Sequence, residues 1–375
     1  MARKLVTLRR ITDLRPVPGS VQFQMAVIDG WTCAVRTGAF AKGELVLFFE
    51  IDSFLPPPAA DKRYEPLHNP VHTGVTTFKG AKGIHVKSIM VNRTYEISQG
   101  VVLKVDAFPE VKDICDAGKE KSLSDMCFAE KLGVQKWEVA PGEAATSLGQ
   151  APVFFPKTGI ERVQNVQTLF TNKYAKATFQ ESVKMDGSSM TVYFVRKDCQ
   201  YYKSLPTLPE TARKADMANG RVGVTSRKVD LSEADPKSRF WAAALRYGLP
   251  GKLDRLGKNV AIQGELVGAS VNGNRHGYAA GEHDFFVFAI YNVDAQAYMN
   301  PREVELRAEQ LGLKHVPVLG YVNIHQIAKT QEDLLKRAEG VGMNGKKREG
   351  LVYKNVEDGR WFKAIANDYL LAIGE

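Results

Sequence analysis

Short segments of alternating apolar and polar residues dominate the first 110 positions of the chain. Alternation is the pattern of a half-buried β-strand, and turn residues such as Asp29-Gly30 separate the segments. The pattern predicts strands over residues 4–11, 22–28, 32–36, 44–49 and 100–105. Five strands with little helical periodicity predict a small β-barrel. An OB-fold is one such barrel, and the number of strands does not distinguish it from the others.

The C-terminal part mixes the strand and helix patterns. The predicted strands cover residues 177–182, 190–195, 259–266 and 285–291, and the first two flank a turn at Asp186-Gly187. Helices are predicted over residues 300–312 and 330–340, because each begins with a capping residue and ends at a glycine. We therefore expect antiparallel sheets flanked by helices, so that the chain as a whole is α+β.

A segment rich in small residues, proline and glycine separates the two parts, at residues 139–152. It has no periodicity, which is typical of a linker. We expect a first domain at residues 1–140, a linker at 141–154 and a second domain at 155–375. A chain of 375 residues is long enough for two or three domains with their own cores.

Composition excludes several classes of protein. With 44% apolar residues, the chain is too rich in hydrophobic side chains to be mainly disordered. Its unbroken apolar runs are far shorter than the roughly 20 residues of a membrane span, and its first ten residues lack the apolar core of a signal peptide. We expect a soluble intracellular protein, cytoplasmic or nuclear, with an organellar location left open. The four scattered cysteines predict neither a disulfide framework nor a zinc site.

Positive charge is concentrated in the second part of the chain. The net charge is +9, of which +2 belongs to residues 1–150 and +7 to residues 151–375. A basic domain favours a polyphosphate or nucleic-acid partner, because each neutralised phosphate releases counterions. Charge alone is equally compatible with a basic protein that has no such partner.

Lys184-Met185-Asp186-Gly187 is the first candidate for chemistry. A lysine that attacks an α-phosphate must be held beside a metal-binding acid, and a turn glycine lets the loop fold tightly around it. Alone, the tetrapeptide is a weak signal, and a hairpin turn with a solvated lysine explains it as well.

Further motifs follow in a fixed order. They are Ser226-Arg227, Gly264-Glu265-Leu266, Phe285 to Phe288, Glu349 to Lys354, and Phe362-Lys363. In sequence, order and separation, this set resembles the nucleotidyltransferase motifs shared by ATP-dependent ligases and capping enzymes.

The resemblance is closest to the ATP-dependent RNA ligases that have an N-terminal OB domain. Gly264 to Gly268 followed by Asn274 resembles their third motif, and residues 154–165 resemble the segment that leads into their catalytic domain. In the first part of the chain, residues 17–19, 28–31, 48–56 and 97–100 also resemble this branch. The candidate barrel precedes the motifs, whereas DNA ligases and capping enzymes place an OB domain after them.

The resemblance implies an OB-like barrel followed by a ligase-type adenylyltransferase domain, unrelated to ATP-grasp enzymes. It implies a three-step reaction that uses ATP and Mg²⁺ or Mn²⁺. Lys184 would form a lysyl–AMP, the AMP would pass to a 5′-phosphate end, and a 3′-hydroxyl would displace it. Lys354 and Lys363 would grip the α-phosphate and stabilise its transition state.

The other motif residues receive roles by the same resemblance. Asp186, Glu265 and Glu349 would hold the metal and the ribose, although any one of them alone is more often an ordinary surface charge. Arg227 would contact the ribose or a phosphate, unless it forms only a salt bridge at the rim. Phe288 would stack on adenine. Val183 and Gly187 complete the expected nucleotide site.

Only a neutral amine can attack phosphorus, and an unperturbed lysine is almost wholly protonated at pH 7. We therefore expect Lys184 to lie in a cation-rich pocket that lowers its pKa. Two positions depart from the family pattern. Trp361 replaces the first lysine of the last motif, and Val183 replaces an acid before the catalytic lysine, so base recognition would depend on backbone groups.

The expected substrates are the ends of nicked duplex RNA or RNA–DNA hybrids, with RNA on the 3′-hydroxyl side. We also expect a role in RNA repair, and a monomer that does not bind membranes. Alternatives are a DNA ligase, an mRNA-capping guanylyltransferase or a non-catalytic nucleic-acid-binding protein.

Three other patterns are weaker. His68 and His72 are separated by Pro70, which breaks a helix that would align them for a metal. Lys346 to Arg348 is a localisation signal, a nucleic-acid contact or a solvated loop. Gly264 and Gly268 do not precede a helix pattern, so they are not a dinucleotide-binding fingerprint.

Overall fold

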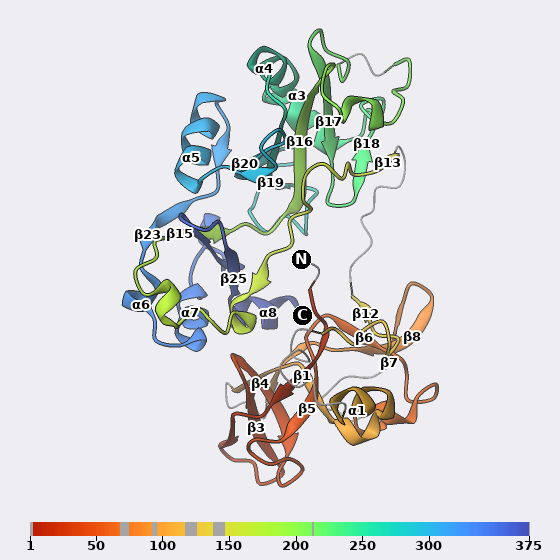
Figure 1. The fold of residues 1–375 in the computed structure, drawn as a ribbon, viewed down its shortest axis with the longest axis vertical. Helices are drawn as coiled ribbons and strands as arrows, with labels where there is room; N and C mark the ends of the chain where they lie inside the picture. Colours follow the sequence, from red (N-terminus) through yellow and green to blue (C-terminus); the bar gives the residue numbers. More distant parts are fainter. Residues whose placement is uncertain are drawn as a thin grey trace.

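The structure is a computed structural model, and it describes residues 3–67, 75–91, 96–116, 126–137, 147–211 and 214–374. Figure 1 shows three layers along the long axis of the molecule. The N-terminal half lies at the bottom, one sheet of the C-terminal half lies in the middle, and a larger sheet lies at the top. Both ends of the chain lie near the centre.

Short strands form the N-terminal half. They are β1 (Val6–Arg10), β2 (Asp13–Pro16), β3 (Phe23–Ile28), β4 (Trp31–Arg36), β5 (Leu45–Phe49), β6 (Ser53–Leu55), β7 (Val75–Phe78), β8 (Ala81–His85), β9 (Ser88–Val91), β10 (Glu96–Gln99), β11 (Val101–Lys104) and β12 (Gln135–Lys136). They pair in the orders β1-β5-β11, β2-β3-β4, β10-β9 and β12-β6-β8-β7. Among the described residues of this half, the α-helix α1 (Pro109–Asp116) packs beside them. The five strands predicted from alternation are all present.

Two sheets form the C-terminal half. The larger has eight strands, ordered β13-β18-β17-β16-β19-β20-β21, with β22 paired to β20. Its strands are β13 (Ser147–Gln150), β16 (Ser188–Arg196), β17 (Gly220–Thr225), β18 (Val229–Leu231), β19 (Val260–Gly268), β20 (His283–Asn292), β21 (Ala297–Tyr298) and β22 (Lys314–His315). The smaller is ordered β14-β25-β24-β15-β23 and comprises β14 (Glu161–Arg162), β15 (Phe179–Lys184), β23 (Val318–Val322), β24 (Gly350–Asn355) and β25 (Trp361–Ile365).

Helices flank both sheets. They are α3 (Arg239–Arg246), α4 (Leu249–Leu256), α5 (Pro301–Gln310), α6 (Ile324–Ile327), α7 (Gln331–Ala338) and α8 (Asn367–Ile373). The two predicted helices correspond to α5 and α7. Asn300 caps α5 through its side chain, and Thr330 and Asp333 form a capping box at the start of α7. The α+β arrangement is therefore confirmed. No helix in the described part of the chain has the length and apolar character to cross a membrane.

The expected linker is only partly described. Residues 138–146 lie outside the described residues, and residues 147–150 form β13, which pairs with β18 at the edge of the larger sheet.

The two largest hydrophobic cores of the described residues divide the molecule at a different place from the boundary expected from the sequence. One core joins Trp31 and Phe48 of the N-terminal half to Phe179 and Tyr353 of the smaller sheet. The larger sheet and α3 have their own core, which includes Phe194, Trp241 and Phe285. The N-terminal half and the smaller sheet are thus packed as one unit.

Buried polar residues reinforce this packing. Glu50 is fully buried and accepts hydrogen bonds from Arg3 Nε at 2.7 Å and from Asn165 Nδ2 at 2.6 Å. Trp31 Nε1 donates to Asn165 Oδ1 at 2.8 Å. Asp52 pairs with Arg3, and its Oδ2 lies 3.6 Å from Arg162 Nη2. Two acids of the N-terminal half therefore contact the C-terminal half, Glu50 through Asn165 and Asp52 through Arg162.

The Asp52→Asn substitution is expected to lower the free energy of unfolding at pH 7 by about 2–3 kcal/mol, because it removes the carboxylate beside the buried Arg162 and one of the two carboxylates that pair with Arg3. Burial alone would raise the pKa of Asp52, but Arg3 and Arg162 lower it to about 2. This contribution to stability is present above about pH 4, the unfolded value, and is lost as the pH falls towards 2. Urea unfolding from pH 7 to pH 3 measures it. Asp106→Asn, which breaks an exposed pair with Lys112, is the control and should leave the free energy of unfolding nearly unchanged. Equal losses in the two variants would contradict the assignment.

Candidate active site

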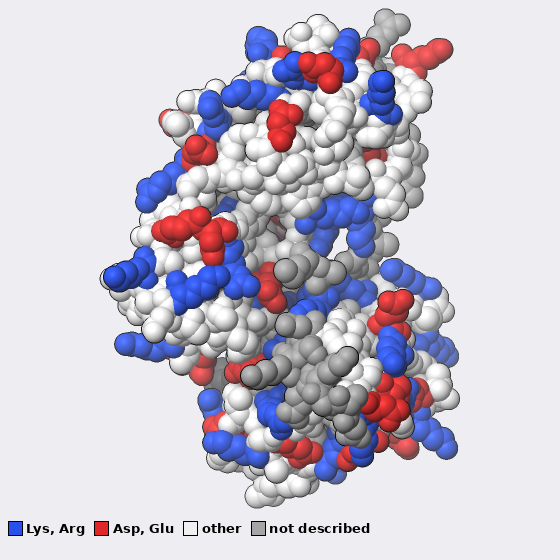
Figure 2. Space-filling model, viewed as in Figure 1, with Lys and Arg blue, Asp and Glu red and all other residues white. Residues whose placement is uncertain are grey.

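A cavity of about 1780 Å³ opens between the two cores, and residues of both halves of the chain line it. Figure 2 shows Lys and Arg side chains gathered above and below this hollow. All ten residues predicted from the motifs line the cavity: Val183, Lys184, Asp186, Gly187, Arg227, Glu265, Phe288, Glu349, Lys354 and Lys363. The fold thus brings together motifs that are up to 180 positions apart.

Lys184 is the last residue of β15, and the following turn carries Asp186 and Gly187. The turn lies tightly against β19. A Cβ atom at Gly187 would be 2.4 Å from the Leu266 carbonyl oxygen and 2.8 Å from Glu265 Cγ. Only glycine fits at this position, because the turn lies so close to β19. This close approach brings Glu265 towards Lys184.

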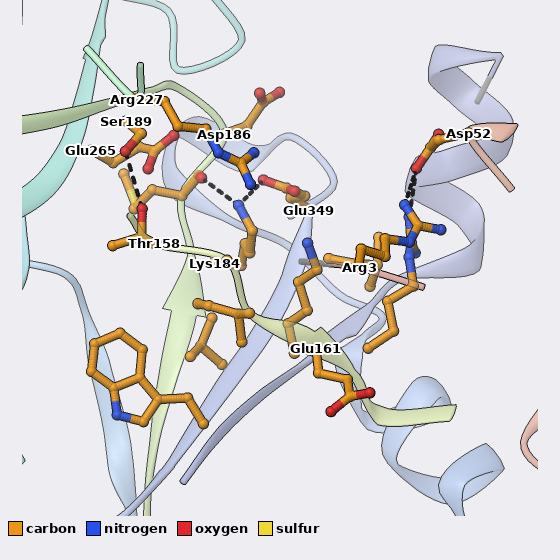
Figure 3. Close-up of a pocket in the computed structure, with 18 of the residues that line it drawn as sticks. Arg3, Asp52, Thr158, Glu161, Lys184, Asp186, Ser189, Arg227, Glu265 and Glu349 are labelled. Atoms are coloured by element: carbon orange, nitrogen blue, oxygen red, sulfur yellow. Dashed lines mark hydrogen bonds and ion pairs between the residues drawn. The ribbon is translucent and has the colours of Figure 1, made fainter. Parts of the chain in front are cut away.

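Carboxylates surround the Lys184 amine. Its Nζ donates to Glu349 Oε2 at 3.0 Å and to the Met185 carbonyl oxygen at 3.3 Å (Figure 3). Burial alone would lower the pKa of Lys184, but Glu349, Glu265 and Asp186 raise it above the value usual for lysine. The expectation of a cation-rich pocket with a lowered Lys184 pKa is therefore wrong for the chain by itself, because anions are the nearest charges.

The same cluster has surplus negative charge. Burial, with repulsion from Glu349 and Asp186, raises the pKa of Glu265 to about 7 against the attraction of Lys184. In the described residues no three His, Cys, Asp or Glu side chains are close enough to enclose a metal ion. Mg²⁺ and Mn²⁺ prefer carboxylate oxygens, and Mg²⁺ usually keeps several waters. The cluster therefore fits a divalent cation held by one or two of these carboxylates and by water.

Asp186 is held by three donors. Asn272 Nδ2 donates to Oδ1 at 2.8 Å, and Tyr369 of α8 donates to Oδ2 at 2.6 Å. Arg275 Nε lies 3.0 Å from Oδ2. Asn272 and Arg275 belong to the loop between β19 and β20.

Aromatic side chains line another part of the cavity. Phe288 on β20 packs at right angles to Trp361, with ring centroids 6.5 Å apart. The Lys354 amine donates to the Phe288 carbonyl oxygen and lies 4.8 Å from the centre of the Trp361 ring. Burial lowers the pKa of Lys354 to about 7, against the attraction of Glu305. Its amine is thus placed beside the aromatic rings, and its role at an α-phosphate stays a prediction.

Lys363 lies in the cationic part of the cavity. Burial lowers its pKa well below the usual value, and repulsion from Arg162, Lys184 and Arg3 adds to this effect. Arg162 is only 6% exposed, and its Nε and Nη1 atoms have no hydrogen-bond partner in the described residues. Buried guanidinium groups of this kind suit a phosphate ligand.

Arg227 also lines the cavity, on the turn between β17 and β18, where its side chain is exposed. Val183 is half-buried beside Met185 and Phe288. Both positions are compatible with the expected nucleotide contacts.

The weaker patterns receive mostly structural explanations. Lys347 pairs with Asp368, and Arg348 donates to the carbonyl oxygens of Arg337, Ala338 and Glu339 at the end of α7. Gly264 and Gly268 lie within β19, so they do not open a helix. His68 and His72 lie outside the described residues.

Five residues of the site were not identified from the sequence: Arg3, Arg162, Asn272, Arg275 and Tyr369. Arg162 lies in a segment that resembles the family, and its position within that segment was the available signal. Asn272 and Tyr369 reach Asp186 from 86 and 183 positions away, and no local pattern marks them.

Comparisons with known proteins agree with this geometry. A family model for RNA ligase matches residues 177–365, and a model for an OB-fold domain matches residues 5–105. A search of curated proteins gives no match.

Solved structures of a Naegleria gruberi RNA ligase are similar over the whole chain. A mutant of that enzyme with ATP and Mn is 32% identical, with a TM-score of 0.82 and complete coverage of both chains. The same enzyme with pyrophosphate is 31% identical, with a TM-score of 0.82 and 99% coverage of each chain. An apo mutant is 32% identical, covers 99% of this chain and 98% of its own, and has a TM-score of 0.82. The chain therefore belongs to the RNA ligase family, and its OB-fold domain precedes the ligase domain.

Proposed function

We propose that this RNA ligase uses ATP to join 3′-hydroxyl and 5′-phosphate ends through a covalent lysyl–AMP at Lys184. The observation that carries the proposal is the position of the Lys184 amine. It contacts Glu349 at 3.0 Å in a cavity with a carboxylate cluster, buried cations and an aromatic platform. Structures of the Naegleria gruberi enzyme with ATP, AMP and Mn support the choice of nucleotide and metal.

In the first step, the neutral Lys184 amine attacks the α-phosphorus of ATP. A nitrogen–phosphorus bond forms, the bond from phosphorus to the bridging oxygen breaks, and pyrophosphate leaves. A proton must leave Lys184 before the attack. A divalent cation bound among Asp186, Glu265 and Glu349 would offset their negative charge, which otherwise keeps the amine protonated, and would polarise the α-phosphate.

The remaining residues orient the nucleotide. Phe288 stacks on the adenine, and Lys354 and Trp361 support this platform. Arg162 is a buried cation and Lys363 is a half-buried lysine whose protonated form a bound phosphate would favour, so both stabilise charge on the phosphates. Arg227 contacts the ribose or a phosphate from the rim.

In the later steps, AMP passes from Lys184 to a 5′-phosphate, and a 3′-hydroxyl displaces AMP to form the phosphodiester. The substrate is a nick in a duplex with RNA on the 3′-hydroxyl side. Residues 1–140 form the domain that grips the duplex, and residues 155–375 form the adenylyltransferase. All ten motif residues line one cavity of a single chain, so a monomer is sufficient for the proposed reaction.

The alternatives predict different products. A capping enzyme would form a covalent guanylate, and a DNA ligase would not need a ribose at the 3′-hydroxyl end. A non-catalytic binding protein would retard nucleic acid in a gel without sealing it. The presence of Lys184, Asp186, Glu265 and Glu349 in one cavity favours an enzyme.

Lys184→Ala should abolish covalent AMP and the sealing of 5′-phosphate ends, while it still seals a pre-adenylylated end, because only the first step uses this nucleophile. Labelled ATP, labelled GTP and gel assays of nicked duplexes measure this. Lys336→Ala, on the exposed face of α7, is the control and should form lysyl–AMP normally. Covalent AMP on the Lys184→Ala variant, or labelling by GTP in the native enzyme, would contradict the proposal.

Phe288→Ala should raise the KM for ATP about tenfold, because stacking on a base contributes about 1–3 kcal/mol. Phe288→Tyr keeps an aromatic ring and should restore most of the affinity. The initial rate of lysyl–AMP formation against ATP concentration measures both variants. An unchanged KM in Phe288→Ala would place adenine elsewhere.

Nicked duplexes that differ only in the sugar at the 3′-hydroxyl end test the substrate. A terminal ribose should be sealed at least about tenfold faster than a deoxyribose, the factor expected when a bound hydroxyl is removed. Equal rates would show that the enzyme does not require RNA at this end.

A further inference from the structure

The loop between β19 and β20 is built to present Arg275 to Asp186. Asn274 fixes its shape, because its side chain accepts from the Tyr278 amide and donates to the Tyr278 carbonyl oxygen, both at 2.8 Å. Asn272 and Asn274 have φ values of 44° and 53°, a left-handed conformation that asparagine tolerates better than most residues. The loop is therefore preorganised.

Arg275 brings a positive charge to a carboxylate assigned to the metal. Its Nε lies 3.0 Å from Asp186 Oδ2, the oxygen that also accepts from Tyr369. Asn272 and Tyr369 are neutral donors, so they can orient Asp186 without offsetting its charge. Arg275 does offset it, and a guanidinium and a divalent cation cannot both occupy the same face of one carboxylate oxygen.

The ion pair between Arg275 and Asp186 is also suited to replacement by a metal ion. The Arg275 side chain is 40% exposed, whereas Asp186 is 11% exposed, so the cation is the mobile partner. Half-exposed ion pairs are weak, and a metal ion can replace one at small cost. A displaced guanidinium keeps other contacts, because it already lies 5.3 Å from the centre of the Tyr369 ring, and its Nε is 3.3 Å from the Asn272 carbonyl oxygen.

We propose that Arg275 is an internal counter-ion of Asp186 that competes with the divalent metal, and that it leaves Asp186 when the metal binds. The inference rests on the proposed function, since it needs a metal at the carboxylate cluster. Arg275 thereby sets the metal concentration at which the site is filled, and it neutralises Asp186 while the site holds no metal.

Binding of Mn²⁺ to the full-length protein without nucleotide tests the proposal, with free Mn²⁺ measured by electron paramagnetic resonance. Arg275→Gln should bind Mn²⁺ about two- to fivefold more tightly than the native protein, the range expected for loss of a half-exposed competing charge. Arg275→Lys keeps the charge and should bind as the native protein does. Thermal unfolding of both variants establishes that they are folded.

Arg246→Gln is the matched control. Arg246 is an exposed arginine of α3 whose Nη1 lies 3.7 Å from the buried Asp284, so its loss changes the net charge equally. It should leave Mn²⁺ affinity unchanged. Unchanged or weaker binding in Arg275→Gln, or an equal gain in Arg246→Gln, would overturn the proposal.

Asp186→Asn separates failure of this inference from failure of the proposed function. If Asp186→Asn weakens Mn²⁺ binding but Arg275→Gln does not strengthen it, the metal site stands and the competition is refuted. If Asp186→Asn leaves Mn²⁺ binding unchanged, Asp186 is not a metal residue, and both the metal assignment and the competition fail.

Discussion

The site depends on one lysine amine held among three carboxylates. Glu349 contacts Lys184 directly, and Glu265 and Asp186 add to the negative field. This arrangement keeps the amine protonated and raises the pKa of Glu265. In the proposed mechanism this protonated amine cannot attack ATP, and a divalent cation that binds to the carboxylates reverses the balance. Activation of the proposed nucleophile then depends on the bound metal.

The two cores explain why the cavity lies where it does. The OB-fold domain and the smaller sheet share one core, and the larger sheet has another. Lys184, Glu349 and Lys363 lie on or beside strands of the smaller sheet, whereas Glu265 and Phe288 lie on the larger one. The proposed nucleotide site therefore spans the boundary between two packed units, and Gly187 allows the turn after β15 to lie close against β19.

Negative and positive groups occupy different parts of the cavity. The carboxylates lie around Lys184, while Arg162 provides a buried cation nearby and Lys363 a basic amine whose pKa is lowered. Glu50 and Asp52 of the OB-fold domain hold Arg3, and Asp52 also lies beside Arg162, so the domain junction and the site share part of one electrostatic network. Such a network makes the OB-fold domain a structural component of the catalytic cavity as well as a candidate RNA-binding surface.

The sequence by itself determined the main strands and the helices α5 and α7, because these follow from local periodicity, capping and turn chemistry. The motif residues were identified by their resemblance to those of a known family. The order of the motifs was enough to indicate the family. Only the tertiary structure decided which charges face each other. Lys184 meets Glu349 across 165 positions, Asp186 meets Asn272 and Tyr369, and the Lys354 amine lies beside aromatic rings. Electrostatic and hydrogen-bonding contacts depend on distance in space and on burial, and neither is encoded in the spacing of residues along the chain.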